Sequence, residues 1–323
     1  MDYNMKYAEV QNARDAYEYF AQLIDDQGEL VEARKEWTKE VMNASVLIKN
    51  PRDKIIPIKG LNMPFIYQEL FDIFNENQPR VMHSREMVKK TMGFEDNIMF
   101  FGNENRQGNS RWSLLKIRNV LRDDKNSRKA VISFGSRRPK VHYPCLIYCH
   151  FIIRDNKLHM TLETRGTALS MGWANDVILF TTLQEMMTGW LTEFYPELTM
   201  GHFLYKTVSM HYYCDKSGKP TWSQDFDPNH TYHPMPFELT HKEWVQENGI
   251  LYHYVDEFMK AGKHEDIDGG TITTYKDLYK PDRTYFKTEY FYKWALILYT
   301  ATMAKANDNA IEHDFLKIYN KDE

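Results

Sequence analysis

One long apolar segment between strand-like segments constrains the fold of this chain most. Val177–Tyr195 is largely apolar and contains no proline, which predicts a central buried helix. Two strands are expected before it, at Leu146–Ile153 and Leu158–Thr164, and the Asp155-Asn156 pair between them suits a hairpin turn. Met200–Tyr213 alternates again after the helix. The order strand, strand, helix, strand predicts a mixed α/β (α+β) domain.

Further helices and strands are expected around this core. Residues from about Ala8 to Met42 are interpreted as two helices separated near Gly28. The apolar face of the first of them would consist of Ala13, Ala16, Tyr17, Phe20, Leu23 and Ile24. Short strands are predicted at Lys54–Ile58 and Ala130–Phe134, and helices at Pro64–Asn75, Ser113–Arg122, Glu238–Lys260 and Phe291–Ala306.

Composition excludes several classes of protein. The 323 residues carry a net charge of −4, which argues against general nucleic-acid binding. Three cysteines do not suggest a disulfide framework. Met1–Leu30 is polar and acidic, unlike a signal peptide, and no apolar run approaches the ~20 residues that span a bilayer. We therefore expect a soluble cytoplasmic protein, in the host cytoplasm if a phage encodes it.

Cys145 is the first candidate for chemistry. It follows Pro144 and opens an apolar strand, so a small buried hydrophobic residue is one interpretation and a nucleophile is the other. A nucleophile needs its thiolate, and Arg165 could supply the cation that lowers the pKa of the thiol. Cys149 lies on the same strand, but its surroundings do not single it out. The spacings of cysteine and histidine match no zinc template, so no metal is expected.

An ordered set of short motifs resembles the thymidylate synthase superfamily. The set consists of Ser127-Arg128-Lys129, Pro144-Cys145, Arg165, Gly172, Asn175-Asp176 and His211-Tyr212-Tyr213. It covers about Ile98 to Tyr213, extends weakly back to Arg52 and Glu69, and does not reach the C-terminal third. The resemblance implies a thymidylate synthase-like fold, with a mixed twisted sheet packed with helices, and a homodimer.

The resemblance also implies a division of the chain and a chemistry. Residues 1–50 would be an N-terminal helical extension, residues 51–214 the catalytic core, and residues 215–323 a divergent C-terminal part of the same domain. Cys145 would add to C6 of a pyrimidine, and 5,10-methylenetetrahydrofolate would deliver one carbon to C5. Glu69 would organise water and proton transfer, although a lone glutamate on an amphipathic helix is usually a solvated charge.

Asp176 is the most informative departure from the thymidylate synthase pattern. Where those enzymes place an asparagine to read the pyrimidine, this chain has Asn175 followed by Asp176, as the phage deoxycytidylate hydroxymethylases do. Cytosine presents an unprotonated N3 and an amino group, which a protonated carboxyl matches, and a carboxylate can pair with protonated N3. Asp176 would also suit the N-cap of the helix that follows, and the two roles are compatible.

The resemblance assigns the remaining contacts to the nucleotide. Phosphate would be held by Arg165 and Arg52 of one subunit and by Arg128 and Lys129 of its partner. His211 and Tyr213 would hold the sugar.

Two further positions depart from the family. Gly166 replaces a serine that bonds phosphate, and the space it leaves could admit a ribose 2′-hydroxyl. Ala168 stands where an aspartate usually faces the folate, so this contact of the family is missing here.

Three functions follow from these residues. The first is folate-dependent hydroxymethylation of a cytidine monophosphate, dCMP rather than CMP. The second is a thymidylate synthase that methylates dUMP. The third is a protein of the same fold that binds nucleotide without catalysis. In each case the ligand is a pyrimidine nucleoside monophosphate, and neither a membrane nor a nucleic acid is expected as a partner.

Overall fold

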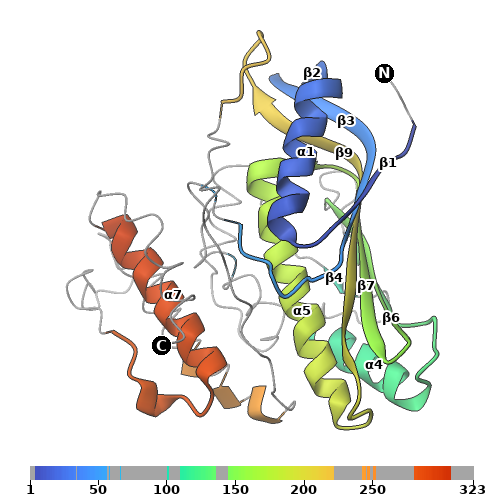
Figure 1. The fold of residues 1–323 in the computed structure, drawn as a ribbon, viewed down its shortest axis with the longest axis vertical. Helices are drawn as coiled ribbons and strands as arrows, with labels where there is room; N and C mark the ends of the chain where they lie inside the picture. The colour runs from blue at the N-terminus through green and yellow to red at the C-terminus, as the bar shows by residue number, and fades with distance from the viewer. Residues whose placement is uncertain are drawn as a thin grey trace.

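A mixed β-sheet with α1 and α5 packed against it makes up most of the described structure (Figure 1). The computed structural model describes residues 4–33, 35–56, 58, 66, 100–101, 110–135, 145–221, 242–244, 246–247, 250–251 and 280–306. Its strands are β1 (Lys6–Val10), β2 (Glu29–Ala33), β3 (Glu36–Ile48), β4 (Phe100–Phe101), β5 (Val131–Gly135), β6 (Leu146–Arg154), β7 (Lys157–Thr164), β8 (Thr167–Ala168) and β9 (Thr199–Cys214). Its α-helices are α1 (Ala13–Gln27), α4 (Ser110–Asp123), α5 (Ala174–Thr192) and α7 (Glu289–Ala306).

The strand order is β1-β3-β9-β7-β6-β5-β4, with β2 paired to β3 and β8 paired to β9. The central strand β9 is antiparallel to β3 and parallel to β7, so the sheet is mixed. A tight turn joins β6 to β7, and its residues Asp155 and Asn156 have φ values of 50° and 55°. Aspartate and asparagine tolerate this left-handed conformation, which two-residue hairpins require. The predicted hairpin is therefore confirmed.

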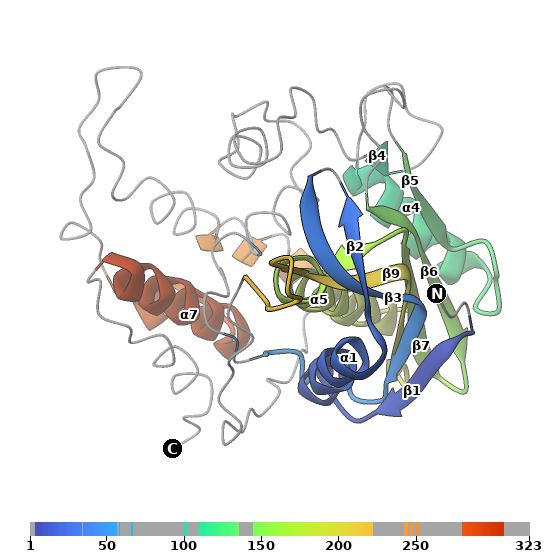
Figure 2. The same cartoon turned by 90° about the horizontal axis from the view of Figure 1, so that it is seen from above.

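Helix α5 is buried almost all round, as its composition predicted, because every residue from Val177 to Leu191 is buried. It lies against the sheet beside α1 (Figures 1 and 2). All six apolar residues that were expected to form the buried face of α1 are buried. Asn12 begins this helix by accepting a hydrogen bond from the backbone of Asp15 at 2.9 Å. The predictions for both helices are confirmed.

The prediction of a second helix before Met42 is wrong. Residues 29–33 and 36–48 form β2 and β3 instead, with Lys35 at φ 70° in the turn between them. Strand β3 pairs with β9 along nearly its whole length and buries Val41, Ala44 and Val46. Residues 1–50 thus contribute strands to the sheet as well as a helix. The division of the chain at residues 50 and 214 stays a prediction.

Other predicted elements have mixed outcomes. The expected helix at Ser113–Arg122 and the expected strand at Ala130–Phe134 are confirmed as α4 and β5, and the expected helix at Phe291–Ala306 is confirmed as α7. The strand expected at Lys54–Ile58 is wrong, because residues 54–56 have no strand conformation and only Ile58 makes a bridge. The helix expected at Pro64–Asn75 lies almost wholly outside the described residues.

Three neighbouring strands bend at the same level of the sheet. Asn43 has a φ of 55°, and the pairing of β3 with β9 omits it together with Val208. At the same level Arg165 and Gly166 separate β7 from β8, which continues the pairing with β9 in the same register. The bend changes which face each side chain occupies, because Thr207 and Met210, three residues apart, are both buried. Arg165 and Gly166 therefore lie where the pairing between strands is interrupted.

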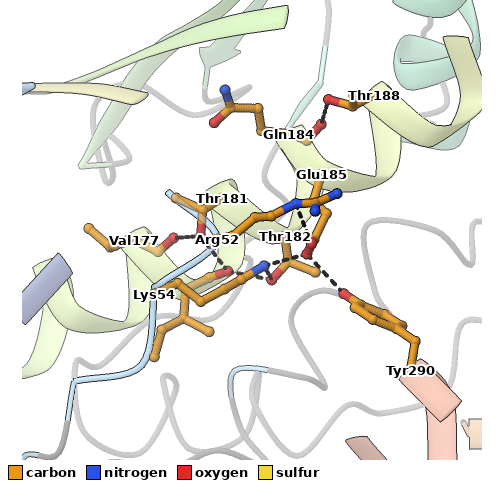
Figure 3. Close-up of polar contacts among 10 residues, drawn as sticks. Arg52, Lys54, Val177, Thr181, Thr182, Gln184, Glu185, Thr188 and Tyr290 are labelled. Carbon is orange, nitrogen blue, oxygen red and sulfur yellow. Dashed lines mark hydrogen bonds and ion pairs between the residues drawn. The ribbon is translucent and has the colours of Figure 1, made fainter. Parts of the chain in front are cut away.

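A buried group of charges attaches α7 to α5 (Figure 3). Glu185 of α5 receives hydrogen bonds from Lys54 Nζ at 2.6 Å and from the Tyr290 hydroxyl of α7 at 3.2 Å. Arg52 Nε lies 3.4 Å from the other carboxylate oxygen. The side chains of Lys54 and Glu185 are each only 2% exposed. We call these four residues the Glu185 cluster.

Among the described helices, none combines the length and the apolar character that crossing a membrane requires.

Candidate functional site

Cys145 and Arg165 are neighbours across the β6–β7 hairpin. Leu146 pairs with Thr164, and the backbone N–H of Arg165 donates to the carbonyl of Cys145 at 2.8 Å. Cys145 is exposed and is not in a disulfide. A thiol and a guanidinium group are thus carried by adjacent residues at the same end of the sheet. This is the arrangement in which a cation can stabilise a thiolate.

The other two cysteines are poor candidates for a nucleophile. Cys149 faces the core, and burial raises the pKa of its thiol. Cys214 is also buried, and burial raises its pKa too. The alternative to a nucleophile, that Cys145 is a small buried hydrophobic residue, is inconsistent with its exposed side chain.

Asp176 lies in the first turn of α5 and contacts the sheet. The hydroxyl of Tyr205 in β9 donates to Asp176 Oδ2 at 3.0 Å, and the same hydroxyl is 3.4 Å from Thr164 Oγ1. Because Thr164 directly precedes Arg165, these contacts place the carboxyl at the same end of the sheet as the thiol. Loss of water around the carboxyl raises its pKa to about 7, although the tyrosine hydrogen bond opposes the change.

The start of α5 also shows whether Asp176 caps the N-terminus of the helix. A π-helix, Leu169–Trp173, leads into α5, so Asp176 is the third residue of the α-helix. Its side chain accepts from Tyr205, and the residue at the cap position is Trp173. Asp176 is therefore not the N-cap. Asn175 precedes it in the same turn and is partly buried.

The indole of Trp173 packs where α1, α5 and β9 meet. Its ring centre is 5.4 Å from that of Phe20 in α1 and 6.0 Å from that of Tyr205. Both contacts are edge-to-face, which is a favourable geometry for aromatic pairs. Since Tyr205 also holds Asp176, this packing fixes the position of the carboxyl relative to the sheet.

His211 and Tyr213 follow the bend on β9. Ala168 of β8 pairs with His211, which brings the histidine beside the segment that carries Arg165. The rings of His211 and Tyr213 meet edge-to-face with centres 5.6 Å apart. Ser209 Oγ is 3.3 Å from His211 Nδ1 and donates to Glu40 Oε2 at 2.6 Å. The sequence did not single out Ser209 or Glu40.

Gly166 borders the same group of side chains. A Cβ atom added to it would lie 3.5 Å from the Cβ of Ser209, which is an ordinary contact distance. A serine side chain would therefore fit in this backbone, and its absence leaves room beside Ser209. Gly166 directly follows the predicted phosphate ligand Arg165, and Ala168, two residues later, pairs with the predicted sugar ligand His211.

The described contacts do not connect Arg52 to this group. Arg52 lies against Glu185, nine residues after Asp176 on α5, which corresponds to about two and a half turns. Asp176 and Glu185 hence project from opposite sides of the helix, one toward the sheet and the other toward α7. Figure 3 shows Arg52 and Lys54 meeting Glu185 on that second side.

Three predicted site residues remain to be placed, the phosphate ligands Arg128 and Lys129 and the catalytic Glu69. Arg128 and Lys129 are exposed just before β5, where the backbone of Lys129 donates to Ser127 Oγ at 3.3 Å. Glu69 lies outside the described residues. No group of three or more metal-ligating side chains occurs in the part of the chain that the structure describes.

The structure thus gathers Cys145, Arg165, Gly166, Asp176, His211 and Tyr213 around one end of the sheet. Tyr205, Ser209 and Glu40 were missed because each makes its contact with a segment that is distant in the sequence. The only local signal was the spacing of Ser209 and His211, two residues apart on one strand, which places their side chains on the same face.

Comparisons with known proteins agree with this fold. No protein-family model matches the chain. Over 222 residues it is 26% identical to a protein of Methanocaldococcus jannaschii named "Putative thymidylate synthase", covering 64% of this chain and 86% of that protein. The structure of thermostable thymidylate synthase A from Bacillus subtilis is similar with a TM-score of 0.50 at 16% identity, covering 62% of this chain and 79% of that one. The predicted fold class, a mixed α/β fold like that of a thymidylate synthase, is confirmed.

Proposed function

We propose that this chain is a thymidylate synthase-like one-carbon transferase that hydroxymethylates C5 of a cytidine monophosphate, dCMP in preference to CMP. The likeness to a thymidylate synthase in fold and to a related protein in sequence supports transfer of one carbon to a pyrimidine. The observation that carries the choice of base is the partly buried carboxyl of Asp176, which accepts a hydrogen bond from Tyr205 and whose pKa is raised to about 7.

Asp176 can match cytosine in either of its protonation states. A neutral carboxyl donates to N3 and accepts from the 4-amino group, and a carboxylate pairs with a protonated N3. Near neutral pH both states are accessible when the pKa is about 7. Uracil presents a donor at N3 and an acceptor at O4, which an amide matches better. A mismatched buried group costs about 1–3 kcal/mol, which corresponds to discrimination of roughly an order of magnitude or more.

Cys145 is the proposed nucleophile. Its thiolate forms a bond to C6, and the electron pair displaced from the C5–C6 double bond makes C5 a carbon nucleophile. When 5,10-methylenetetrahydrofolate is bound, it supplies the one-carbon unit, and water provides the oxygen of the hydroxymethyl group. The proton on C5 leaves and the bond between sulfur and C6 breaks, which restores the aromatic base. Glu69 is the proposed organiser of that water.

The folate has less support than the nucleotide. Ala168 offers only a methyl group at the position where an aspartate was expected, and it is partly buried beside His211. The side chain of Ala168 therefore offers a pterin no polar contact. We assign no described residue to the folate.

The remaining assignments concern the nucleotide. Arg165 would bind the phosphate, and His211 and Tyr213 the sugar, because Arg165 adjoins Gly166 and His211 pairs with Ala168, two residues further along. Asn175 would contact the base or sugar beside Asp176. In a proposed homodimer, Arg128 and Lys129 would reach the phosphate of the partner subunit, and Arg52 would be a further phosphate ligand.

Release of tritium tests the proposal directly. The protein is incubated with dCMP, CMP or dUMP labelled at C5, together with 5,10-methylenetetrahydrofolate, and the mass of the product is measured. We expect release from dCMP, slower release from CMP, and a product that carries a hydroxymethyl group. Release from dUMP alone, with a methylated product, would instead identify a thymidylate synthase.

Variants separate the base from the chemistry. Cys145→Ala should abolish turnover and leave nucleotide binding, whereas Cys149→Ala removes a thiol that faces the core and serves as the control. Asp176→Asn should lower turnover of dCMP by about tenfold or more and raise that of dUMP, because the amide matches uracil. Binding of a nucleotide without turnover by the unaltered protein would favour a non-catalytic role.

A further inference from the structure

We infer that Glu40 and Ser209 are positioning residues that hold a proton on Nδ1 of His211, so that the ring presents Nε2 as an acceptor to a sugar hydroxyl. The identity of the ligand rests on the proposed function. The position of the proton rests only on contacts among the described residues.

The hydrogen-bond directions follow from counting protons. Ser209 has one hydroxyl proton, and its Oγ lies 2.6 Å from Glu40 Oε2, a distance typical of a hydrogen bond to a carboxylate. A carboxylate can only accept, so this proton points to Glu40. Ser209 Oγ is also 3.3 Å from His211 Nδ1 and can only accept there. The proton in that contact therefore belongs to Nδ1.

The fold holds the three side chains in place. Glu40 pairs directly with His211 across β3 and β9, and Ser209 is two residues away on the same strand as the histidine. Thr207 Oγ1 donates to the carbonyl of Ser209 at 2.9 Å, which ties down the backbone at the bend. The edge-to-face contact with Tyr213 restricts the tilt of the imidazole. Glu40, Ser209 and His211, which we call the relay, are all partly buried.

The tautomer determines what the ring can recognise. A neutral histidine with a proton on Nδ1 has an acceptor at Nε2. A sugar hydroxyl can donate to that nitrogen, whereas a phosphate dianion has no proton to give. The charge of Glu40 also disfavours phosphate nearby. The relay consequently directs the sugar toward His211 and leaves the phosphate to the cation of Arg165.

The proton can be located without any ligand. Two-bond ¹H–¹⁵N correlation spectra of the ligand-free protein, recorded above the pKa of the ring, distinguish a protonated ring nitrogen from an unprotonated one. We expect His211 to be protonated at Nδ1. In Ser209→Ala this preference should be lost, and Ser209→Thr, which keeps the hydroxyl, should restore it. A protonated Nε2 with an unprotonated Nδ1 in the unaltered protein would overturn the inference.

Binding then tests the recognition of the sugar. Dissociation constants are measured for dCMP and for its analogue that lacks the 3′-hydroxyl. Ser209→Ala and Glu40→Gln should weaken dCMP binding by about threefold to tenfold, the effect of one neutral hydrogen bond, and leave the analogue nearly unchanged. Glu36→Gln, an exposed carboxylate on the same strand, is the matched control.

The outcomes separate this inference from the proposed function. Equal losses for dCMP and the analogue would show that the relay supports the fold and does not read the hydroxyl. If the unaltered protein bound no pyrimidine nucleotide, the proposed function and the recognition of a sugar would fail together. The spectra would still decide where the proton lies. Melting temperatures of all variants identify any loss that arises from unfolding.

Discussion

At the scale of single residues, Asp176 couples stability to pH. Its pKa in the folded protein is about 7, above the ordinary value of 3.8, because the carboxyl loses contact with water. Between these values the folded state binds more protons than the unfolded state, so the free energy of unfolding falls as the pH rises. The contribution is fully present below the ordinary pKa and is lost as the pH rises through about 7.

Replacement by a neutral isostere should remove this dependence. At each pH the melting temperature of the unaltered protein is subtracted from that of Asp176→Asn. We expect this difference to be more positive at pH 8 than at pH 5. The asparagine can still accept from Tyr205, so the contact with the sheet is retained. Asp26→Asn, at an exposed position on α1, is the control. Differences that stay constant across this range would show that the carboxyl is not desolvated in solution.

The site residues that could be predicted from the sequence lie in local motifs, whereas those that could not be predicted come together only through strand pairing. Cys145 and Arg165 stood out because their motifs are local and ordered, and the hairpin turn between their strands was legible from Asp155-Asn156. Ser209 and Glu40 meet only because β3 and β9 pair in one particular register. A contact between positions 169 residues apart has no signature in either segment.

At the scale of elements, helical patterns were more legible than long strands. Helix α1 shows one apolar face over four turns, and α5 is apolar throughout, so both were predicted. The chain up to Met42, which forms β2 and the first half of β3, was mistaken for a helix. Its apolar residues Trp37 and Val41 are four residues apart, which is also helical spacing.

The Glu185 cluster joins α5, α7 and the segment that follows β3, and it should be costly to break. Glu185→Gln would leave the ammonium of Lys54 buried without a counter-charge, which costs about 3–5 kcal/mol. Burial already lowers the pKa of Lys54, and the carboxylate opposes that effect. Urea unfolding should show the loss, and Tyr290→Phe, which removes one hydrogen bond to the same carboxylate, should cost only about 1 kcal/mol.

A double variant distinguishes burial of charge from loss of packing. Lys54→Met combined with Glu185→Leu replaces both charges with apolar side chains of similar size, which is often close to neutral in stability. We expect it to recover most of the loss seen in Glu185→Gln. If the double variant were as unstable as the single one, the cluster would contribute through geometry that apolar groups cannot reproduce.

At the scale of the whole molecule, the sheet presents a second face to solvent. Helices α1 and α5 pack on one face, where β6 buries Cys149, Phe151 and Ile153. The alternate residues of the strands project the other way, and among them Val131 and Val208 are 42% and 40% exposed. Arg128 and Lys129 directly precede β5 at the edge of this face. A second copy of the chain on this face would cover its apolar side chains.

Mixing two inactive variants tests whether such a dimer shares its sites. In the proposed arrangement Arg128 contributes to the site of the partner subunit. Arg165 contributes to the site of its own subunit, because its backbone N–H is hydrogen-bonded to the carbonyl of Cys145. A heterodimer of Cys145→Ala and Arg128→Ala then has one intact site and should recover about half of the activity of a normal dimer. The subunits carry different affinity tags, and heterodimers are purified through both.

The matched control replaces Arg128→Ala by Arg165→Ala in the same experiment. Each site of that heterodimer lacks either the thiol or the guanidinium, since both residues belong to one subunit, so no activity should return. Recovery in the first pair and none in the second requires that the phosphate ligand crosses the interface, because both pairs contain the same number of altered residues. Absence of recovery in both pairs, with heterodimers confirmed by mass, would place Arg128 on its own subunit's site.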